Sequence, residues 1–439
     1  MNAQYVRKAR IILLSPSLWR KRLVFWLGAI SVGFIASGFA LAADWAQKTF
    51  DAIVGTYHWA PLVVSPLLFG IIAWLTQKFF PSVPGSGIPQ AIAARILRDR
   101  ASREYLLGAQ VIIGKIFLTI LGILAGASIG REGPTVQVGA AIMMLCARFG
   151  GLSAERGIVL AGASAGVAAA FNTPLAGIVF AIEEMARAFE QRNSSIVLAA
   201  IVFSGAAAMS ISGNYNYFGY TNAELTVAGN WLAILLAGVS GGLLGSVFCK
   251  MVVGGGKHLR EMYNGFGSKN PVIFAGICGI VIAVIGFMTH DSTYGTGYTV
   301  GYSLLHSTMT PLWWQIPAKM LTTAVSAVSG ITGGVFAPSL SIGATIGGEL
   351  SKLLPHTSTQ GIILLSMAAY FAAVTQAPIT AFVIVLEITG NATAAVPLIA
   401  AALIAAAIAR MLCPTSLYHA LAKNFIIETK KRVSAQPVI

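Results

Sequence analysis

Three glycine-rich stretches hold the residues best suited to chemistry, and each places a proline where an apolar helical segment begins. They are Gly85–Pro89 (GSGIP), Gly130–Pro134 (GREGP) and Gly333–Pro338 (GGVFAP). Proline is favoured in the first turn of a helix, so each stretch predicts a helix N-terminus with unpaired N–H groups. The dipole at such an end favours an anion. Three converging ends would bind an anion without a full positive charge, which lets the ion leave again.

Glu132 lies inside an apolar stretch, where an ionisable side chain is costly and is therefore a functional candidate. A copy of the same motif later in the chain has Phe336 at the equivalent position. A carboxylate at this place would occupy the anion site when ionised and leave it when protonated or displaced. The sequence therefore predicts a gate whose movement is linked to a proton.

Two further acids, Glu183 and Glu184, follow an apolar run and precede Arg187, which indicates the cytoplasmic end of a helix. Glu183 has a repeat partner in Glu387, which favours a structural role. Glu184 is paired with Ile388 and is the better functional candidate. Spacing alone leaves two interpretations open, because Glu184 could equally be a solvated carboxylate near Arg187.

Purely structural roles are an alternative explanation for these motifs. Small residues also let helices approach closely, and this explains any single glycine motif at least as well as a binding site does. The segment Gly162–Gly166 matches the G-x-S-x-G pattern of hydrolases, but that pattern works on a strand-to-helix turn. Here Ser164 lies in an Ala/Gly-rich helical segment, with Ala368 at the equivalent position, so close helix packing is favoured. No Walker sequence for ATP is present.

The composition requires lipid as the solvent. Of 439 residues, 56% are hydrophobic and 10% charged, with a mean hydropathy of +0.76, whereas a soluble domain carries about 25% charged residues. This excludes a cytosolic enzyme, a disordered or collagen-like chain and a disulfide-stapled secreted domain. The apolar stretches reach about 20 residues, as membrane helices do, rather than the ~10 of barrel strands. The fold class predicted is an all-α polytopic membrane protein.

Basic residues collect at the chain ends and give a net charge of +14. Residues 1–22 hold six basic and no acidic side chains, and Lys430, Lys431 and Arg432 lie near the other end. Excess Lys and Arg beside membrane spans favours the cytoplasmic face, so both termini are expected there. Contact with anionic lipid is favoured over nucleic acid as the role of this charge. The division predicted is a basic cytoplasmic segment 1–22, a membrane domain 23–425 and a cytoplasmic tail 426–439.

Metal and disulfide chemistry have no support in the sequence. The four cysteines, at 146, 249, 278 and 413, lie in or beside apolar segments without a close pair, and the six histidines form no helical i, i+4 pair. No cofactor and no metal are therefore expected.

An internal repeat organises the chain. Six residues lie 204 positions after an identical residue: Lys319, Gly334, Pro338, Gly343, Pro378 and Glu387. Four arginines occur between positions 95 and 103, whereas the equivalent stretch 299–308 has no Asp, Glu, Lys or Arg. A basic loop in one copy and a neutral loop in the other indicate repeats of inverted topology, approximately 60–215 and 270–413. Broken helices in such repeats are typical of a transport pathway.

GSGIP, GREGP, GGVFAP and a tyrosine near the end, Tyr418, occur in this order within the repeat. Together they resemble the CLC family of chloride channels and chloride/proton exchangers, of the prokaryotic exchanger type, over residues 23–425. The resemblance implies the CLC fold, with broken and re-entrant helices, and a homodimer in which each subunit has its own pathway. It also implies that chloride is bound by the following residues: Ser86, Gly87, Ile88, Val335, Phe336 and Tyr418.

By the same resemblance, Glu132 matches the gating glutamate and Glu184 the internal proton-transfer glutamate of exchangers. Two features depart from the family. The chain ends at 439, so the paired cytosolic regulatory domains of many eukaryotic members are not expected. Gln90 and Ile92 stand where similar prokaryotic exchangers carry acids, so Lys115 is expected to lack an acidic partner, which bears on the internal proton route.

The function expected is a secondary active chloride/proton antiporter, not an enzyme, in the bacterial inner (plasma) membrane. Two alternatives stay open. One is a passive chloride channel with the same pore, in which Glu132 only gates. The other, from a different class, is an intramembrane hydrolase that uses Ser164.

Overall fold

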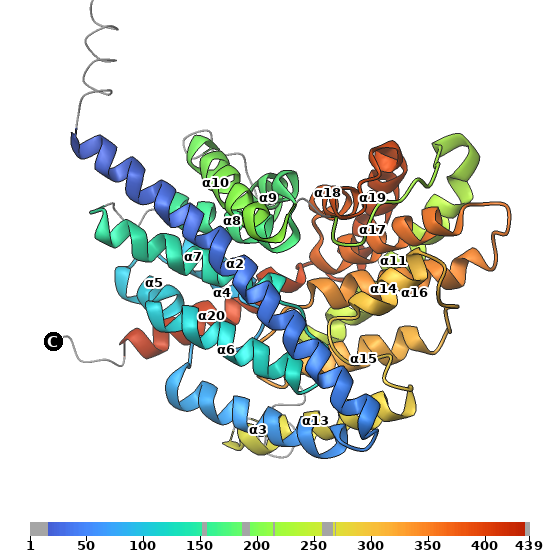
Figure 1. Ribbon diagram of the computed structural model, residues 1–439, viewed down its shortest axis with the longest axis horizontal. Helices are drawn as coiled ribbons and strands as arrows, with labels where there is room; N and C mark the ends of the chain where they lie inside the picture. The colour runs from blue at the N-terminus through green and yellow to red at the C-terminus, as the bar shows by residue number, and fades with distance from the viewer. Residues whose placement is uncertain are drawn as a thin grey trace, which may run out of the picture.

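The computed structural model describes residues 16–151, 156–186, 194–213, 216–256, 267 and 269–434. Arg187 and most of the basic segment 1–22 lie outside these residues. The described part is almost wholly helical and contains two isolated β-bridges but no named strand (Figure 1). The predicted all-α fold class is confirmed.

Six of the described helical stretches are long and apolar enough to cross a membrane. The helix α2 has 41 residues and is therefore about 60 Å long, well beyond the ~30 Å hydrocarbon core. The protein is thus an integral, multi-pass membrane protein. The helices that form these stretches are α2 (Pro16–Thr56), α3 (Pro61–Phe79), α5 (Arg100–Leu107) with α6 (Ala109–Leu124), α11 (Val227–Lys250) with the π-helical turn η3 (Met251–Gly255), α13 (Pro271–Met288), and η4 (Ala392–Ala394) with α19 (Ala395–Leu412).

The remaining helices are shorter and build the interior. Two of them, α8 and α17, are buried on every side over most of their length, as expected for helices that are apolar all round. The set comprises α4 (Ile88–Ile96), α7 (Glu132–Phe149), α8 (Arg156–Phe171), α9 (Pro174–Phe180) with the π-helical turn η1 (Ala181–Ala186), α10 (Ser194–Ser212), α14 (Tyr298–Leu305), α15 (Gln315–Val328), α16 (Phe336–Ser351), α17 (Thr359–Thr375), α18 (Pro378–Thr389) and α20 (Leu417–Ser434).

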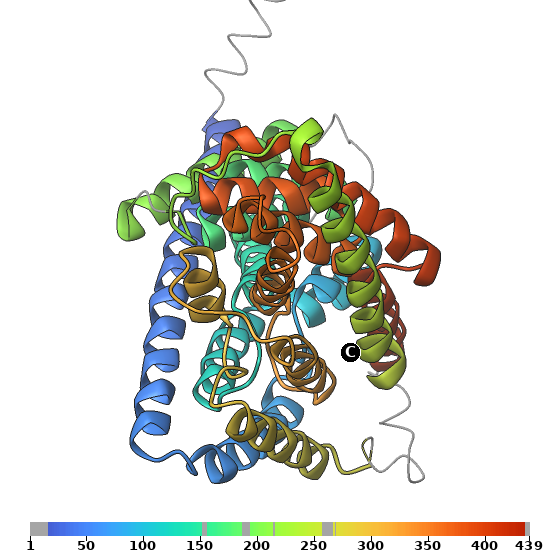
Figure 2. The ribbon, with the colours of Figure 1, turned by 90° about the vertical axis from the view of Figure 1, so that its right-hand side faces the viewer.

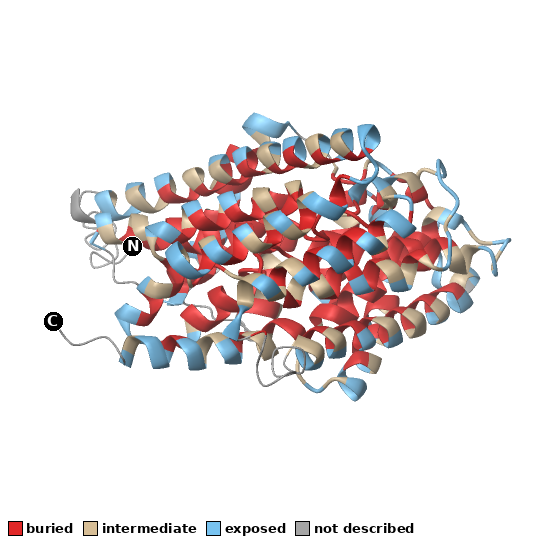
Figure 3. Cartoon of the chain, turned by 90° about the horizontal axis from the view of Figure 1, so that it is seen from below, coloured by how far each residue is buried: buried red, intermediate tan, exposed pale blue. Residues whose placement is uncertain are grey.

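Long helices line the outside and short helices fill the centre. In Figure 2, α2 runs along one side of the molecule and α11 along the other. The outward faces carry exposed large apolar side chains such as Trp45, Trp74 and Phe117, while the interior is buried (Figure 3). Apolar side chains that face outward along membrane-length helices are suited to contact with lipid tails.

The inverted repeat is visible in the helix order. α6, α7, α8 and α9 are followed about 204 positions later by α15, α16, α17 and α18; α7 begins at Glu132 and α16 at Phe336. α3 and α4 precede α13 and α14 by 210 positions, since the first copy has a longer connection that contains α5. The two copies also meet, because α3 packs on α13 and α9 on α18.

Glu183 and Glu387 hold the two copies together in the same way. The Glu387 carboxylate accepts the N–H groups of Leu175 (3.1 Å) and Ala176 (2.7 Å) in the first turn of α9. Glu183 accepts the equivalent two N–H groups of α18 at 3.1 and 2.6 Å. Each acid therefore satisfies the unpaired donors of the other copy's helix. The structural role predicted for Glu183 agrees with these bonds.

Close packing explains the hydrolase-like pattern. Ser164 is completely buried in the middle of α8. On either side of it, Gly162 and Gly166 contact the backbone of α7 so closely that a side chain at either position would collide with it. The serine lies within a continuous helix and not on a strand-to-helix turn, which supports the packing interpretation.

The predicted domain limits stay a prediction. α2 begins at Pro16 and α20 ends at Ser434, so helices continue through both limits of the expected membrane domain. The first turns of α2 and the helix α20 lie on the same side of the molecule, at the left of Figure 1.

Candidate anion-binding site

Backbone hydrogen bonds bring the three glycine-rich stretches together. Gly85 donates its N–H to Ile331 O (2.9 Å), and its own carbonyl accepts the N–H of Gly333 (3.1 Å). Gly130 and Gly334 exchange N–H···O bonds of 2.7 and 2.8 Å in both directions. The first turns of α4, α7 and α16 therefore converge. Such convergence is the condition under which the sequence predicts an anion site.

The loop before α4 is closed by its own residues. Gly87 has φ = 105°, a conformation that glycine adopts without strain. Gln90 Oε1 accepts the Gly87 N–H (3.0 Å), and its Nε2 donates to Pro84 O (2.5 Å). Gln90, noted in the sequence only because it is not acidic, thus has the structural task of fixing this loop.

Lys115 is completely buried and bonds to the same loop. Its Nζ donates to the carbonyls of Val83 and Gly85, each at 2.7 Å. Carbonyl oxygens thus face this ammonium, in keeping with the expectation that it lacks an acidic partner. The carbonyls that bind Lys115 belong to the loop that carries Ser86.

The second copy repeats this arrangement at Lys319. Its Nζ donates to the carbonyls of Thr293 (2.9 Å), Tyr294 (3.2 Å) and Gly295 (2.8 Å). The loop that it holds, Gly295–Gly297, leads into α14 as Gly85–Gly87 leads into α4. Two equivalent buried lysines therefore fix two related loops. The loop bound by Lys115 is the one that meets the first turns of α7 and α16.

If the Ser86 loop binds an anion, we expect Lys115→Met to weaken the binding of added chloride by about tenfold, since two buried carbonyls lose their donor and the loop loses its anchor. Lys319→Met is the matched control, because it removes the same contact at the other loop. Both variants should have a lower melting temperature, while only Lys115→Met should bind chloride more weakly in titration calorimetry of the purified protein. Equal chloride affinity in the two variants would contradict a role for Lys115 in the site.

Two hydroxyl groups line the site. Ser86 lies in the loop before α4 and Tyr418 at the start of α20, and their hydroxyls face each other. Both residues are buried, and neither hydroxyl forms a well-aligned hydrogen bond with the described residues. Buried polar groups are normally paired, so this pair is ready to donate to a ligand such as an anion.

Glu132 is the first residue of α7 and is completely buried. Its carboxylate folds back over Gly130 and lies beside the N–H of Ala337, in the first turn of α16. It is also within electrostatic range of the Tyr418 hydroxyl. Neither carboxylate oxygen has a well-aligned hydrogen bond to a described residue. The carboxylate therefore occupies the kind of place that an anion would take.

The Arg131 side chain, next to Glu132 in the sequence, is bound by residues of α2. Its Nη1 donates to Asp44 Oδ1 (2.7 Å) and to Ala40 O (2.6 Å), and its side chain is buried whereas that of Asp44 is exposed. Sequence reasoning did not single out Asp44. The signal was an acid directly after the apolar run 23–43, but only the fold shows that its partner is the residue before Glu132.

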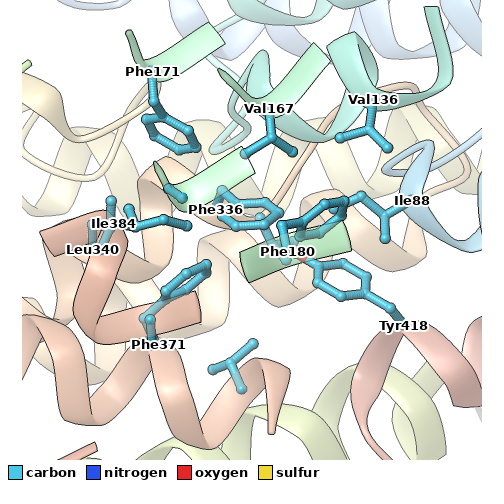
Figure 4. Packing of buried hydrophobic residues seen from close by; sticks show 14 of the residues in the cluster. Ile88, Val136, Val167, Phe171, Phe180, Phe336, Leu340, Phe371, Ile384 and Tyr418 are labelled. Atoms are coloured by element: carbon cyan, nitrogen blue, oxygen red, sulfur yellow. The ribbon is translucent and has the colours of Figure 1, made fainter. Parts of the chain in front are cut away.

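An aromatic cluster surrounds the start of α16. The Phe336 ring packs on Phe171 (5.9 Å between centroids), Phe180 (6.4 Å) and Phe371 (4.6 Å), and it stacks on Tyr418 (5.8 Å, 20° between planes). Figure 4 shows Phe180 and Phe336 in the middle of this cluster, next to Tyr418. Such apolar walls exclude water and strengthen electrostatic interactions with a bound ion.

Glu184 lies in the π-helical turn η1 and is buried. π-helical turns are frequent at functional sites. The carboxylate is within electrostatic range of the Tyr418 hydroxyl, and its Oε1 is 3.4 Å from Nδ1 of His419. The alternative that Glu184 is a solvated carboxylate is wrong, because the folded protein covers it. Its suggested neighbour Arg187 lies outside the described residues.

The fold defines a polytopic membrane protein whose inverted repeats converge on a buried cluster of hydroxyl, carboxylate and backbone N–H groups. The family model described as voltage gated chloride channel matches residues 67–410. Since this covers most of the chain, the protein belongs to that family. The resemblance to the CLC family is thereby confirmed.

Three solved structures share the fold. A slow cyanobacterial Cl⁻/H⁺ antiporter has a TM-score of 0.80 at 22% identity, with 94% of this chain and 99% of that chain covered. A CLC-type fluoride/proton antiporter has a TM-score of 0.76 at 20% identity, with 91% and 96% covered. A eukaryotic CLC transporter has a TM-score of 0.72 at 20% identity, with 92% and 74% covered. At these identities the likeness concerns the fold.

Proposed function

We propose that the protein is a secondary active antiporter that exchanges chloride for protons. The observation that carries this proposal is the Glu132 carboxylate, buried beside the Ala337 N–H at a place where the Ser86 and Tyr418 hydroxyls also converge. A group that competes with an anion for its place and also takes up a proton links the two ions. Two of the similar structures are described as antiporters, which agrees with this function.

The cycle follows from the groups present. Chloride is bound by the hydroxyls of Ser86 and Tyr418 and by backbone amides at the starts of α4 and α16, among them Ile88 and Phe336, in the loops that Gly87 and Val335 shape. When Glu132 takes up a proton its attraction to these donors falls, and the anion replaces it. When it releases the proton, the carboxylate competes again. Glu184 passes protons between the cytoplasm and the region of Tyr418.

The assembly and location belong to the same proposal. The protein is a homodimer with one pathway in each subunit, and it lies in the bacterial inner membrane. Both termini face the cytoplasm, because α2 and α20 place basic residues at the same side of the molecule (Figure 1). The transported ligands are chloride and protons, and the activity is transport, not catalysis.

Liposome measurements test this function. We expect the reconstituted protein to move protons against their gradient when a chloride gradient is imposed, as recorded with a pH electrode while valinomycin and potassium clamp the potential. Chloride flux without any proton movement would contradict the exchanger and support the passive chloride channel. Empty liposomes are the control.

A further inference from the structure

A surface hollow borders His419, the residue whose imidazole lies beside Glu184. It has a volume of about 220 Å³ and is lined by residues of α20, the end of α4 and the turn before α20. Ile96, Pro414 and Lys423 at its rim are exposed, so the hollow is open to solvent. A hollow of this size has room for several water molecules.

His419 separates the hollow from Glu184. The imidazole lines the hollow, and its Nδ1 lies 3.4 Å from Glu184 Oε1 and 3.1 Å from Ser416 Oγ. The His419 side chain is 14% exposed and that of Glu184 5%. The exposure thus falls from the hollow to the imidazole and then to the carboxylate, in the order in which a proton would travel inward.

The neighbouring charged groups have other partners or point elsewhere. On α4, Arg95 donates to Met185 O (2.9 Å). On α5, Arg103 donates to the carbonyls of Ala94 and Leu97. Lys423 lies on α20 itself at the exposed rim, and the described sequences of α17 and η3, which also contact α20, contain no charged residue.

Glu183, the other acid of the turn η1, is not suited to pass a proton between the hollow and Glu184. Its two oxygens accept three hydrogen bonds from the first turn of α18. Among the described groups beside Glu184, this leaves the imidazole of His419 as the one with both a solvent-facing side and a carboxylate within reach.

On the basis of the exchange proposed above, we propose that His419 relays protons between water in this hollow and Glu184. The imidazole accepts a proton from a hydronium ion, which leaves as water, and becomes imidazolium. It then donates the proton on Nδ1 to the Glu184 carboxylate, and the products are a neutral imidazole and a neutral carboxyl group. Imidazole is suited to this task because one ring nitrogen can accept a proton while the other donates one.

The test uses His419→Ala in liposomes, with proton and chloride fluxes measured together. We expect proton flux to fall by at least about tenfold, in line with loss of one proton-transfer group. Added imidazole should restore most of it, because the small molecule fits into the space left by the side chain, whereas a bulkier buffer that titrates in the same range should not. His356→Ala, at an exposed position in the turn before α17, is the matched control and should transport like the wild type.

Two results would overturn the relay. The first is wild-type proton flux in His419→Ala, and the second is a loss that imidazole does not restore, since a structural defect would not respond to it. Neither result would touch the exchange itself, which fails only when the wild-type protein moves no protons in the same experiment.

Discussion

Glu132→Gln abolishes proton transport and leaves chloride transport in place: this is the expected result with the largest effect. The amide has nearly the shape of the carboxylate but can neither take up a proton nor compete with chloride as an anion. Like the protonated acid, the neutral amide is only weakly attracted to Ala337 N–H and the neighbouring donors, so chloride can replace it and bind. Proton flux in the liposome assay should fall by at least about 100-fold, as for removal of an essential proton-transfer group.

Variants of Glu184 distinguish the gating role of Glu132 from the delivery of protons to it. Glu184→Ala should also stop proton transport, but Glu132 can still titrate there, so the chloride flux of this variant should keep its dependence on pH. Glu132→Gln and Glu132→Ala should lose that dependence. Glu428→Gln, an exposed acid that pairs with Arg432 on α20, is the control and should behave as wild type. Undiminished proton pumping by Glu132→Gln would contradict the central role of this carboxylate.

Features that depend on a short stretch of sequence could be predicted, namely the starts of helices and the segments that are helical in lipid. Glycine and proline at positions such as Gly87 and Pro134 specify where helices begin, and long apolar runs specify which segments are helical in lipid. The repeat offset indicated a structural role for Glu183, and its bonds to α18 agree with this, because a residue kept in both copies serves the contact between them. These inferences needed no knowledge of which segments pack together.

Contacts between distant segments could not be predicted in this way. The bonds that Lys115 donates to the loop of Val83, and that Arg131 donates to Asp44, join residues that are tens of positions apart. His419 follows Tyr418 directly in the sequence, yet nothing in the spacing indicates that its ring meets Glu184. The interpretation of Glu184 as solvated failed for the same reason, since burial is decided by helices from other parts of the chain.

The second large effect is expected on chloride affinity, when the hydroxyls of the proposed chloride site are removed. Ser86→Ala and Tyr418→Phe each remove one hydroxyl donor from a buried anion, and a hydrogen bond to a charged group contributes about 1.5–3 kcal/mol. Each change should therefore weaken chloride binding by about 10- to 100-fold, as measured by titration calorimetry. The double variant should bind no chloride in the accessible concentration range. Tyr418→Phe retains the ring that stacks on Phe336, so the aromatic cluster should stay intact.

Two other buried hydroxyls provide matched controls for these changes. Ser164 and Tyr370 are completely buried, and their hydroxyls also lack a well-aligned partner among the described residues. Ser164→Ala and Tyr370→Phe therefore test whether removing any buried hydroxyl weakens binding through a general change in packing. Wild-type chloride affinity in both controls, with loss in Ser86→Ala and Tyr418→Phe, would locate the anion between α4 and α20. Similar losses in all four variants would instead show that the effect is not specific to these two hydroxyls, and the proposed site would have to be abandoned.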